Sequence, residues 1–144
     1  MSAHVATPDR STVLAAVMPD LLSLRLEDDD EVGFATLVAA SPGVCAGLLV
    51  IKELGGRVGV RTRELVPDGA SVEPNDPVAE LGGPLSAIRA VAPLALTWMT
   101  RLSAVASGAT APAPGDDLER WASRLSAPGA LRHDGPSFRM EFEG

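Results

Sequence analysis

The chain has 144 residues, a length typical of one compact domain, and 46% of them are hydrophobic, which is enough to build a core. Its net charge of -7 opposes the binding of nucleic-acid phosphates, and no apolar run reaches the roughly 18 residues of a membrane span. The N-terminus also lacks the charged and apolar regions of a secretion signal. We therefore expect a soluble cytoplasmic protein that binds neither nucleic acid nor membrane.

The first part of the chain combines a polar start with a helical pattern. Residues 1–10 are polar and are expected to form a flexible N-terminus. A first helix is predicted to begin at Ser11 or Thr12, which are good N-cap residues, and to bend or restart at Pro19. The acidic run at 27–31 indicates a solvated turn, because it lacks the ligand spacing of a calcium loop.

Strand and helix signals alternate in the middle of the chain. Residues 34–40 are typical of a buried strand, and the turn residues at 41–44 end it. The pattern of 46–54 predicts a second helix that stops at Gly55 and Gly56.

A half-exposed strand and a hairpin turn come next. The alternation over 57–66 indicates a strand with arginines on one face. These are Arg57, Arg61 and Arg63. Residues 67–70 predict a tight turn in which Gly69 takes positive φ, and 77–83 predict another short strand.

A long helix and a short C-terminal extension complete the pattern. Apolar residues at helical spacing predict a helix over 84–107, which Pro93 should kink or divide. Residues 108–115 have the composition of a linker, and Asp116 is a good N-cap for a last helix. The alternation of 137–143 predicts a final strand. Its inward-facing side chains are expected to be Phe138, Met140 and Phe142.

Three stretches, in order, resemble the N-terminal domain of one enzyme family. They are LVAASPGVCAGL at 37–48, VPDGASVEPNDPVAELGGPL at 66–85 and ALTWMTRLSAVAS at 95–107. The family is quinolinate phosphoribosyltransferase, also called nicotinate-nucleotide pyrophosphorylase (carboxylating), and the resemblance covers roughly residues 12–107.

The resemblance implies an α+β fold, a small α/β-hammerhead-like sandwich in which a mixed or antiparallel sheet packs on helices. One long helix is expected near residues 85–107. The family-like domain then spans 11–107, and 116–144 add a helix and a strand to the same domain. In the family a catalytic α/β barrel follows, which needs about 200 residues or more. Only 37 residues follow Ser107, so we expect no barrel in this chain.

The resemblance also bears on substrate binding. The family's long helix carries a Glu-Arg pair whose arginine holds a substrate carboxylate in the partner subunit, and here Ala92 and Pro93 take those positions. Thr97 stands where the family has asparagine. Arg89 is a candidate replacement one helical turn earlier, the alternative being a surface arginine. We do not expect this chain alone to transfer phosphoribosyl groups.

Other residue types offer little for catalysis. His133 beside Asp134 is the one candidate for acid–base chemistry, with an exposed loop pair as the alternative. Ser103 and Ser107 have no base nearby, and Cys45 is expected to be a packed thiol. No metal-ligand spacing or phosphate-binding loop occurs, and we predict no cofactor and no metal.

Binding functions therefore remain open. Arg61 and Arg63 are candidates for an anionic ligand or partner, or belong to a solvated strand face. Trp98 is a candidate for an apolar pocket, a core or a dimer interface. A biotinyl or lipoyl carrier is disfavoured, because the one lysine, Lys52, falls within a predicted helix.

The sequence thus predicts a catalytically degenerate homologue of the family's N-terminal domain, acting in dimerisation, substrate capping or interaction. Its expected partner is a second copy, as in the family's head-to-tail dimer, or a separate barrel subunit. The alternative is a small biosynthetic enzyme or binding protein that uses the fold for a mostly apolar or anionic ligand.

Overall fold

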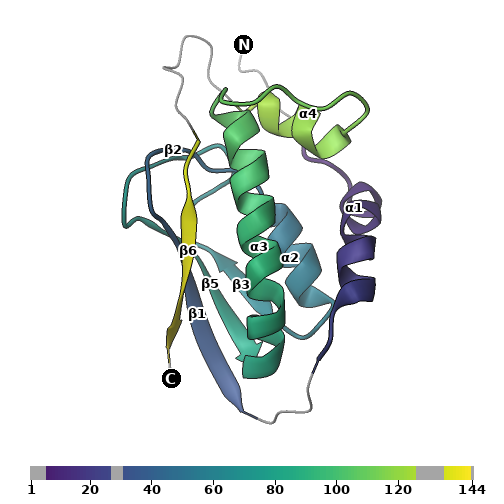
Figure 1. The fold of residues 1–144 in the computed structure, drawn as a ribbon, viewed down its shortest axis with the longest axis vertical. Helices are drawn as coiled ribbons and strands as arrows, with labels where there is room; N and C mark the ends of the chain where they lie inside the picture. Colours follow the sequence, from purple (N-terminus) through teal and green to yellow (C-terminus); the bar gives the residue numbers. More distant parts are fainter. Residues whose placement is uncertain (1–5, 27–30, 126–134, 144) are drawn as a thin grey trace.

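The computed structural model describes residues 6–26, 31–125 and 135–143, which form an antiparallel sheet with helices on one face (Figure 1). The α+β class and the packing of the sheet on helices are as predicted. In chain order the elements are α1 (Arg10–Ser23), β1 (Val32–Ala39), β2 (Gly43–Val44), α2 (Leu48–Gly56), β3 (Arg61–Glu64), β4 (Ser71–Val72), β5 (Pro77–Pro84), α3 (Leu85–Ala106), α4 (Asp117–Ser123) and β6 (Phe138–Glu143).

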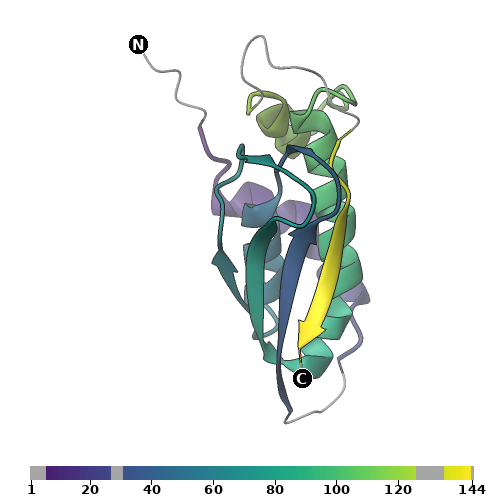
Figure 2. The ribbon, with the colours of Figure 1, turned by 90° about the vertical axis from the view of Figure 1, so that its left-hand side faces the viewer.

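The main sheet has the strand order β3-β5-β1-β6, and every neighbouring pair is antiparallel. The last strand, β6, pairs with the first, β1, so the C-terminal segment completes the sheet at one edge. Figure 2 shows the four strands in front of the helices, with β3 and β6 at the two edges. The short strands β2 and β4 form a separate two-stranded ladder.

Aliphatic side chains fill the space between the sheet and the helices. Leu37 of β1 and Leu81 of β5 point inward and are almost completely buried. They belong to the same core as Ile51 of α2 and Ile88 and Met99 of α3. Apolar side chains that alternate along a strand bury one face of the sheet, which explains why the helices collect on that side.

The helix α3 runs unbroken from Leu85 to Ala106, so the predicted division at Pro93 is wrong. Pro93 faces solvent, and the buried side chains Val91 and Ala95 hold the helix against the core on either side of it. Their burial outweighs the loss of one main-chain hydrogen bond.

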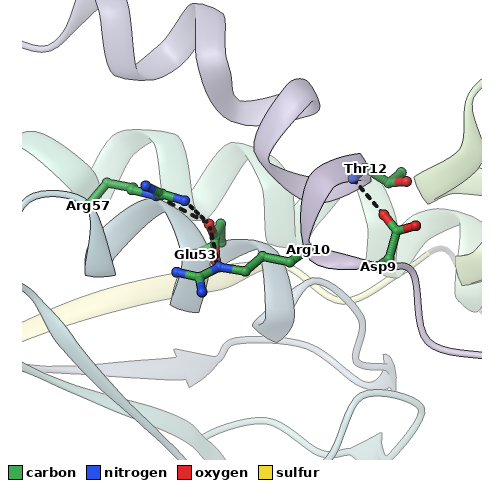
Figure 3. A network of polar contacts seen from close by, with 5 residues as sticks. All are labelled: Asp9, Arg10, Thr12, Glu53 and Arg57. Carbon is green, nitrogen blue, oxygen red and sulfur yellow. Dashed lines mark hydrogen bonds and ion pairs between the residues drawn. The ribbon is translucent and has the colours of Figure 1, made fainter.

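The helices α1 and α2 begin at other residues than predicted. Asp9 caps α1, because its carboxylate accepts a hydrogen bond of 2.8 Å from the Thr12 N–H (Figure 3). Neither Ser11 nor Thr12 takes that place. The start of α2 is Leu48 rather than Ala46, since the Ala46 main chain is hydrogen bonded to a side chain of α3. The predicted end at the glycine pair is confirmed.

The strand predicted over 57–66 is shorter in the structure. Its first residues form a turn, in which the N–H groups of Val58 and Val60 both donate to the Gly55 carbonyl oxygen. Gly59 adopts a φ of +85° there, and the strand begins only at Arg61. Local hydrogen bonds at the end of α2 therefore replace the first half of the predicted strand.

The turn and the last strand match the prediction with one exception. Gly69 has a φ of +96° in the turn before β4. Phe138 and Met140 of β6 pack on the core as expected. Phe142 is 48% exposed, however, because β6 is an edge strand and, among the described residues, has a neighbouring strand on one side only.

Candidate functional site

The outer face of the sheet carries the first group of predicted site residues. Arg61 lies opposite Gly82, which in turn lies opposite Phe34, so these residues form one row across three strands. Phe34 is 59% exposed, and its ring lies over Gly82, where an added Cβ would be 3.3 Å from ring carbons. No helix of the described residues covers this row (Figure 2).

A second row completes the group. Arg63 lies opposite Glu80, and their charged groups are 3.7 Å apart on the surface. Arg61 and Arg63 thus share one face, as the alternation predicted, and they border a shallow groove of ≈ 460 Å³ that includes Phe34. Two guanidinium groups beside an aromatic ring can bind an anion or an acidic partner, but they supply no acid–base group at neutral pH.

Arg57 does not belong to this arginine face, although the sequence pattern placed it there. It follows the last residue of α2, and its guanidinium binds the carboxylate of Glu53 at 3.0 Å (Figure 3). Arg10 of α1 binds the same carboxylate at 3.2 Å. Burial raises the pKa of Glu53, but the hydrogen bonds from Arg57 and Arg10 outweigh it and lower the pKa overall. The cluster therefore connects α1 to α2.

Arg89 lies elsewhere, on the exposed side of α3. It borders a groove of ≈ 460 Å³ between α3 and β6. The other lining residues are Ala92, Pro93, Leu96, Phe138, Arg139, Met140 and Phe142. Pro93 therefore forms part of a mainly apolar wall that also includes the guanidinium groups of Arg89 and Arg139.

Thr97 and Trp98 occupy a third place, near α1 and α4. The Thr97 hydroxyl donates to the Pro93 carbonyl oxygen of its own helix. Trp98 is 7% exposed, its indole N–H donates to Asp20 of α1 at 2.8 Å, and the Arg101 guanidinium stacks 4.6 Å from its ring centre. Of the three roles considered for Trp98, the structure shows a core position between helices.

The predicted site residues consequently fall into three separate regions. His133 and Asp134 lie outside the described residues. Within residues 6–26, 31–125 and 135–143, no group of three or more His, Cys, Asp or Glu side chains is placed to hold a metal ion. None of the helices in that part of the chain has the length and apolar character needed to cross a membrane.

Two serines that were considered only as nucleophiles have a structural role. The Ser103 hydroxyl accepts from the Ala46 N–H at 2.9 Å and donates to the Ala46 carbonyl oxygen at 3.0 Å. Ser107, one turn later, binds both main-chain groups of Val44 in the same way. Ser103 and Ser107 are four residues apart and so lie on the same side of α3. This spacing was the sequence signal that both hydroxyls could bind one neighbouring segment of the chain.

Asp68 is the residue that the sequence analysis missed. Its carboxylate accepts from the N–H groups of Gly47, Leu48 and Leu49 at 2.8–3.2 Å, so it occupies the anion-binding end of α2. Burial raises the pKa of Asp68, and the hydrogen bonds from Leu48, Leu49 and Gly47 only partly oppose this. The Asp68-Gly69 pair is visible in the sequence, but such a pair predicts only a turn. It does not show that the aspartate caps a helix elsewhere in the chain.

Cys45 is a packed thiol, as predicted. It is completely buried, and burial, with smaller effects from the charges of Asp68 and Glu64, raises its pKa to about 12. The thiolate is therefore absent at neutral pH, which makes the sulfur a poor nucleophile.

Comparison with known proteins identifies what the chain is similar to. Residues 20–103 match the family model of the quinolinate phosphoribosyl transferase N-terminal domain. The fold is similar to the nicotinate-nucleotide pyrophosphorylase from Francisella tularensis, with 18% identity, a TM-score of 0.74, and 92% of this chain and 56% of that chain covered. NadC from Streptococcus pyogenes has 22% identity and a TM-score of 0.69, with 91% of this chain and 55% of that chain covered. The chain thus spans about half the length of the solved proteins that it matches.

Proposed function

Because this chain belongs to the quinolinate phosphoribosyltransferase family through its N-terminal domain, we propose that it acts as an interaction and capping module. Its outer sheet face covers the substrate end of a barrel of this family that belongs to a separate subunit. The module itself carries out no phosphoribosyl transfer.

The difference between the two faces of the sheet carries this proposal. Leu37 on the inner face is fully buried, whereas Phe34 and Val32 on the outer face are 59% and 67% exposed. An exposed aromatic side chain next to an exposed valine costs solvation free energy unless a partner covers both. Aromatic and arginine side chains together are the types most enriched at the centres of protein interfaces.

The arginines suit the capping role. Arg61 and Arg63 extend from the edge strand β3 and are free to reach beyond the sheet, since the ion pair of Arg63 with Glu80 is long and exposed. A guanidinium binds a carboxylate through two parallel hydrogen bonds, so either arginine can hold an acidic partner residue or a carboxylate substrate beneath the module.

The side chains of the described residues support the absence of independent catalysis. Ser103 and Ser107 have both hydroxyl functions occupied by main-chain groups, and the Cys45 thiol is buried and protonated. Pro93 replaces the family's carboxylate-binding arginine. Arg89 is one turn away and faces the groove next to β6, on the opposite side of the sheet from Arg61.

Light scattering of the purified chain, alone and mixed with a quinolinate phosphoribosyltransferase barrel from the same source, tests the proposal. We expect a hetero-complex that Phe34→Ser combined with Arg61→Ser weakens at least about tenfold, as for a substitution at an interface centre. Leu22→Ser is the matched control, since Leu22 is 79% exposed on α1. A complex that is equally sensitive to both variants, or the absence of any complex, would contradict the proposal.

One observation favours a second function, the binding of a small anion with an aromatic body. The Phe34 ring over Gly82 offers a stacking surface beside two guanidinium groups. Calorimetric titration of the chain with quinolinate distinguishes this alternative. Binding of quinolinate that Arg61→Ser and Arg63→Ser abolish would support this second function. The absence of a heat of binding would contradict it and favour a macromolecular partner for the outer face.

A further inference from the structure

The edge strand β6 has a sequence that is complementary to itself. Residues 138–142 read Phe-Arg-Met-Glu-Phe, with an aromatic side chain at each end, opposite charges next to the ends and methionine in the centre. Two such strands in antiparallel orientation, with Met140 facing Met140, place Phe138 opposite Phe142 and Arg139 opposite Glu141. Both combinations stabilise neighbouring strands, and each occurs twice in a symmetric pair.

The main-chain groups of β6 point in the direction that such pairing needs. The β1–β6 ladder continues to the hydrogen bond from the Ala40 N–H to the Ser137 carbonyl oxygen, 2.8 Å long. Hydrogen-bonded positions alternate along an antiparallel ladder, so 139, 141 and 143 point toward β1. The N–H and C=O groups of Phe138, Met140 and Phe142 therefore point away from β1, toward the edge where the described residues place no further strand. In the self-complementary register these same residues face one another.

The side chains on the two faces of β6 agree with this register. Arg139 and Glu141 lie on the outer face with exposed fractions of 42% and 54%, and a weak contact of 3.4 Å joins them within the strand. Arg139 also donates a hydrogen bond of 3.0 Å to the side-chain oxygen of Asn75. On the inner face Phe142 is half exposed beside the apolar groove of α3. Pairing brings the Phe142 of a second copy next to Phe138, at the mouth of that groove, and covers an aromatic ring that water now contacts.

The opposite edge lacks these features. The strand β3 has four residues, and three of its side chains are charged. Short, charged edges are a common means by which proteins prevent strand pairing. The strand β6 has six residues, pairs with β1 without a bulge and contains no proline. Of the two edges, only β6 has the length and the apolar inner face that favour another strand.

We infer that the chain forms a symmetric homodimer in which two β6 strands pair in antiparallel orientation about Met140, giving one continuous eight-stranded sheet. This goes beyond the proposed function, because it concerns the edge of the sheet and requires no barrel. The outer faces of both copies remain open for the interaction proposed above.

Charge reversal tests the register directly. Arg139→Glu and Glu141→Arg each create two like-charge pairs across the dimer, which should weaken it roughly tenfold or more. An equal mixture of the two single variants restores two Arg–Glu pairs and should form a heterodimer, and the double variant R139E/E141R should dimerise like the original chain. Arg124→Glu is the matched control, since Arg124 is exposed on the segment after α4. Sedimentation velocity over a range of concentrations measures each association.

The outcomes separate this inference from the proposed function. Weak self-association of each single variant, with recovery on mixing, supports β6 pairing whether or not a barrel binds. A monomer at all concentrations, or a dimer indifferent to both charge reversals, overturns it. Circular dichroism of each variant shows whether loss of the Arg139 contact to Asn75, 3.0 Å in the structure, has altered the fold.

Discussion

The two faces of the sheet are built from the same strands but differ in how far their side chains are buried. On the inner face, Ala35, Leu37 and Leu81 are buried against helices, and the Ser103 hydroxyl nearby is paired with the main chain of Ala46. On the outer face, Phe34 of β1 and Arg63 of β3 remain in contact with water. The inner face accounts for the stability of the fold, whereas the outer face holds side chains that the fold does not need. The difference separates residues that explain folding from residues that are candidates for binding a partner.

The largest expected effect comes from removing an inner side chain. Leu37→Ala leaves a cavity beneath a side chain that is 0% exposed and should lower the free energy of unfolding by about 2–5 kcal/mol. Phe34→Ala on the outer face of the same strand should cost less than about 1 kcal/mol, because water already contacts the ring. Urea denaturation of both variants measures the difference. Equal losses would show that the outer face also belongs to the core.

A smaller effect on stability is expected for the hydrogen bonds between α3 and the segment before α2. Ser103→Ala leaves the buried Ala46 N–H without its acceptor and should cost about 1–3 kcal/mol. Ser23→Ala is the control, since that hydroxyl is exposed and donates to a carbonyl oxygen of its own helix. Thermal unfolding of the two variants gives the comparison. A neutral Ser103→Ala would mean that water or a shifted main chain replaces the hydroxyl.

The smallest effect concerns two aspartates with the same capping role and different exposure. Asp68→Asn keeps one oxygen acceptor and loses the other, and should cost about 1 kcal/mol. Burial raises the pKa of Asp68 above 3.8, so its folded state holds the proton more tightly than its unfolded state. The resulting stabilisation is complete below pH 3.8 and disappears as the pH rises through the folded pKa. The advantage of the original chain over Asp68→Asn should therefore shrink with rising pH.

The stabilisation by Asp9 is expected to change with pH in the opposite direction. Hydrogen bonds from Thr12, and then Ser11, lower its pKa below 3.8, so its stabilisation is present above that pH and is lost as the pH falls through the folded value. The advantage of the original chain over Asp9→Asn should grow with rising pH. Denaturation midpoints of both variants between pH 3 and 7 test the pair. Parallel trends would contradict the assignment of burial as the cause at Asp68.

Much of the fold was predictable because its signals are local. The alternation around Leu37, the apolar stripe of α3 and the cap at Asp116 lie within single elements and depend on neighbouring residues. Errors arose where contacts from elsewhere decide an element's end. Ser103 and Asp68 hold the chain before α2, and the burial of α3 overrides Pro93.

The candidate site was predictable only in part. Alternation placed Arg61 and Arg63 on one face, but it assigned Arg57 to them although the chain turns at Gly59. Arg89, Thr97 and Trp98 lie on one helix, yet they face different neighbours, which a single helical pattern does not specify.

The sequence alone determined the family, the α+β class and the order of nearly all elements, because motifs, caps and periodicity act over short stretches. Only the tertiary structure decided that β6 completes the sheet beside β1, that Asp68 caps α2, and that Phe34 and Phe142 stay exposed. The physical reason is that side-chain patterns state which residues share a face, whereas burial depends on which distant segment covers that face.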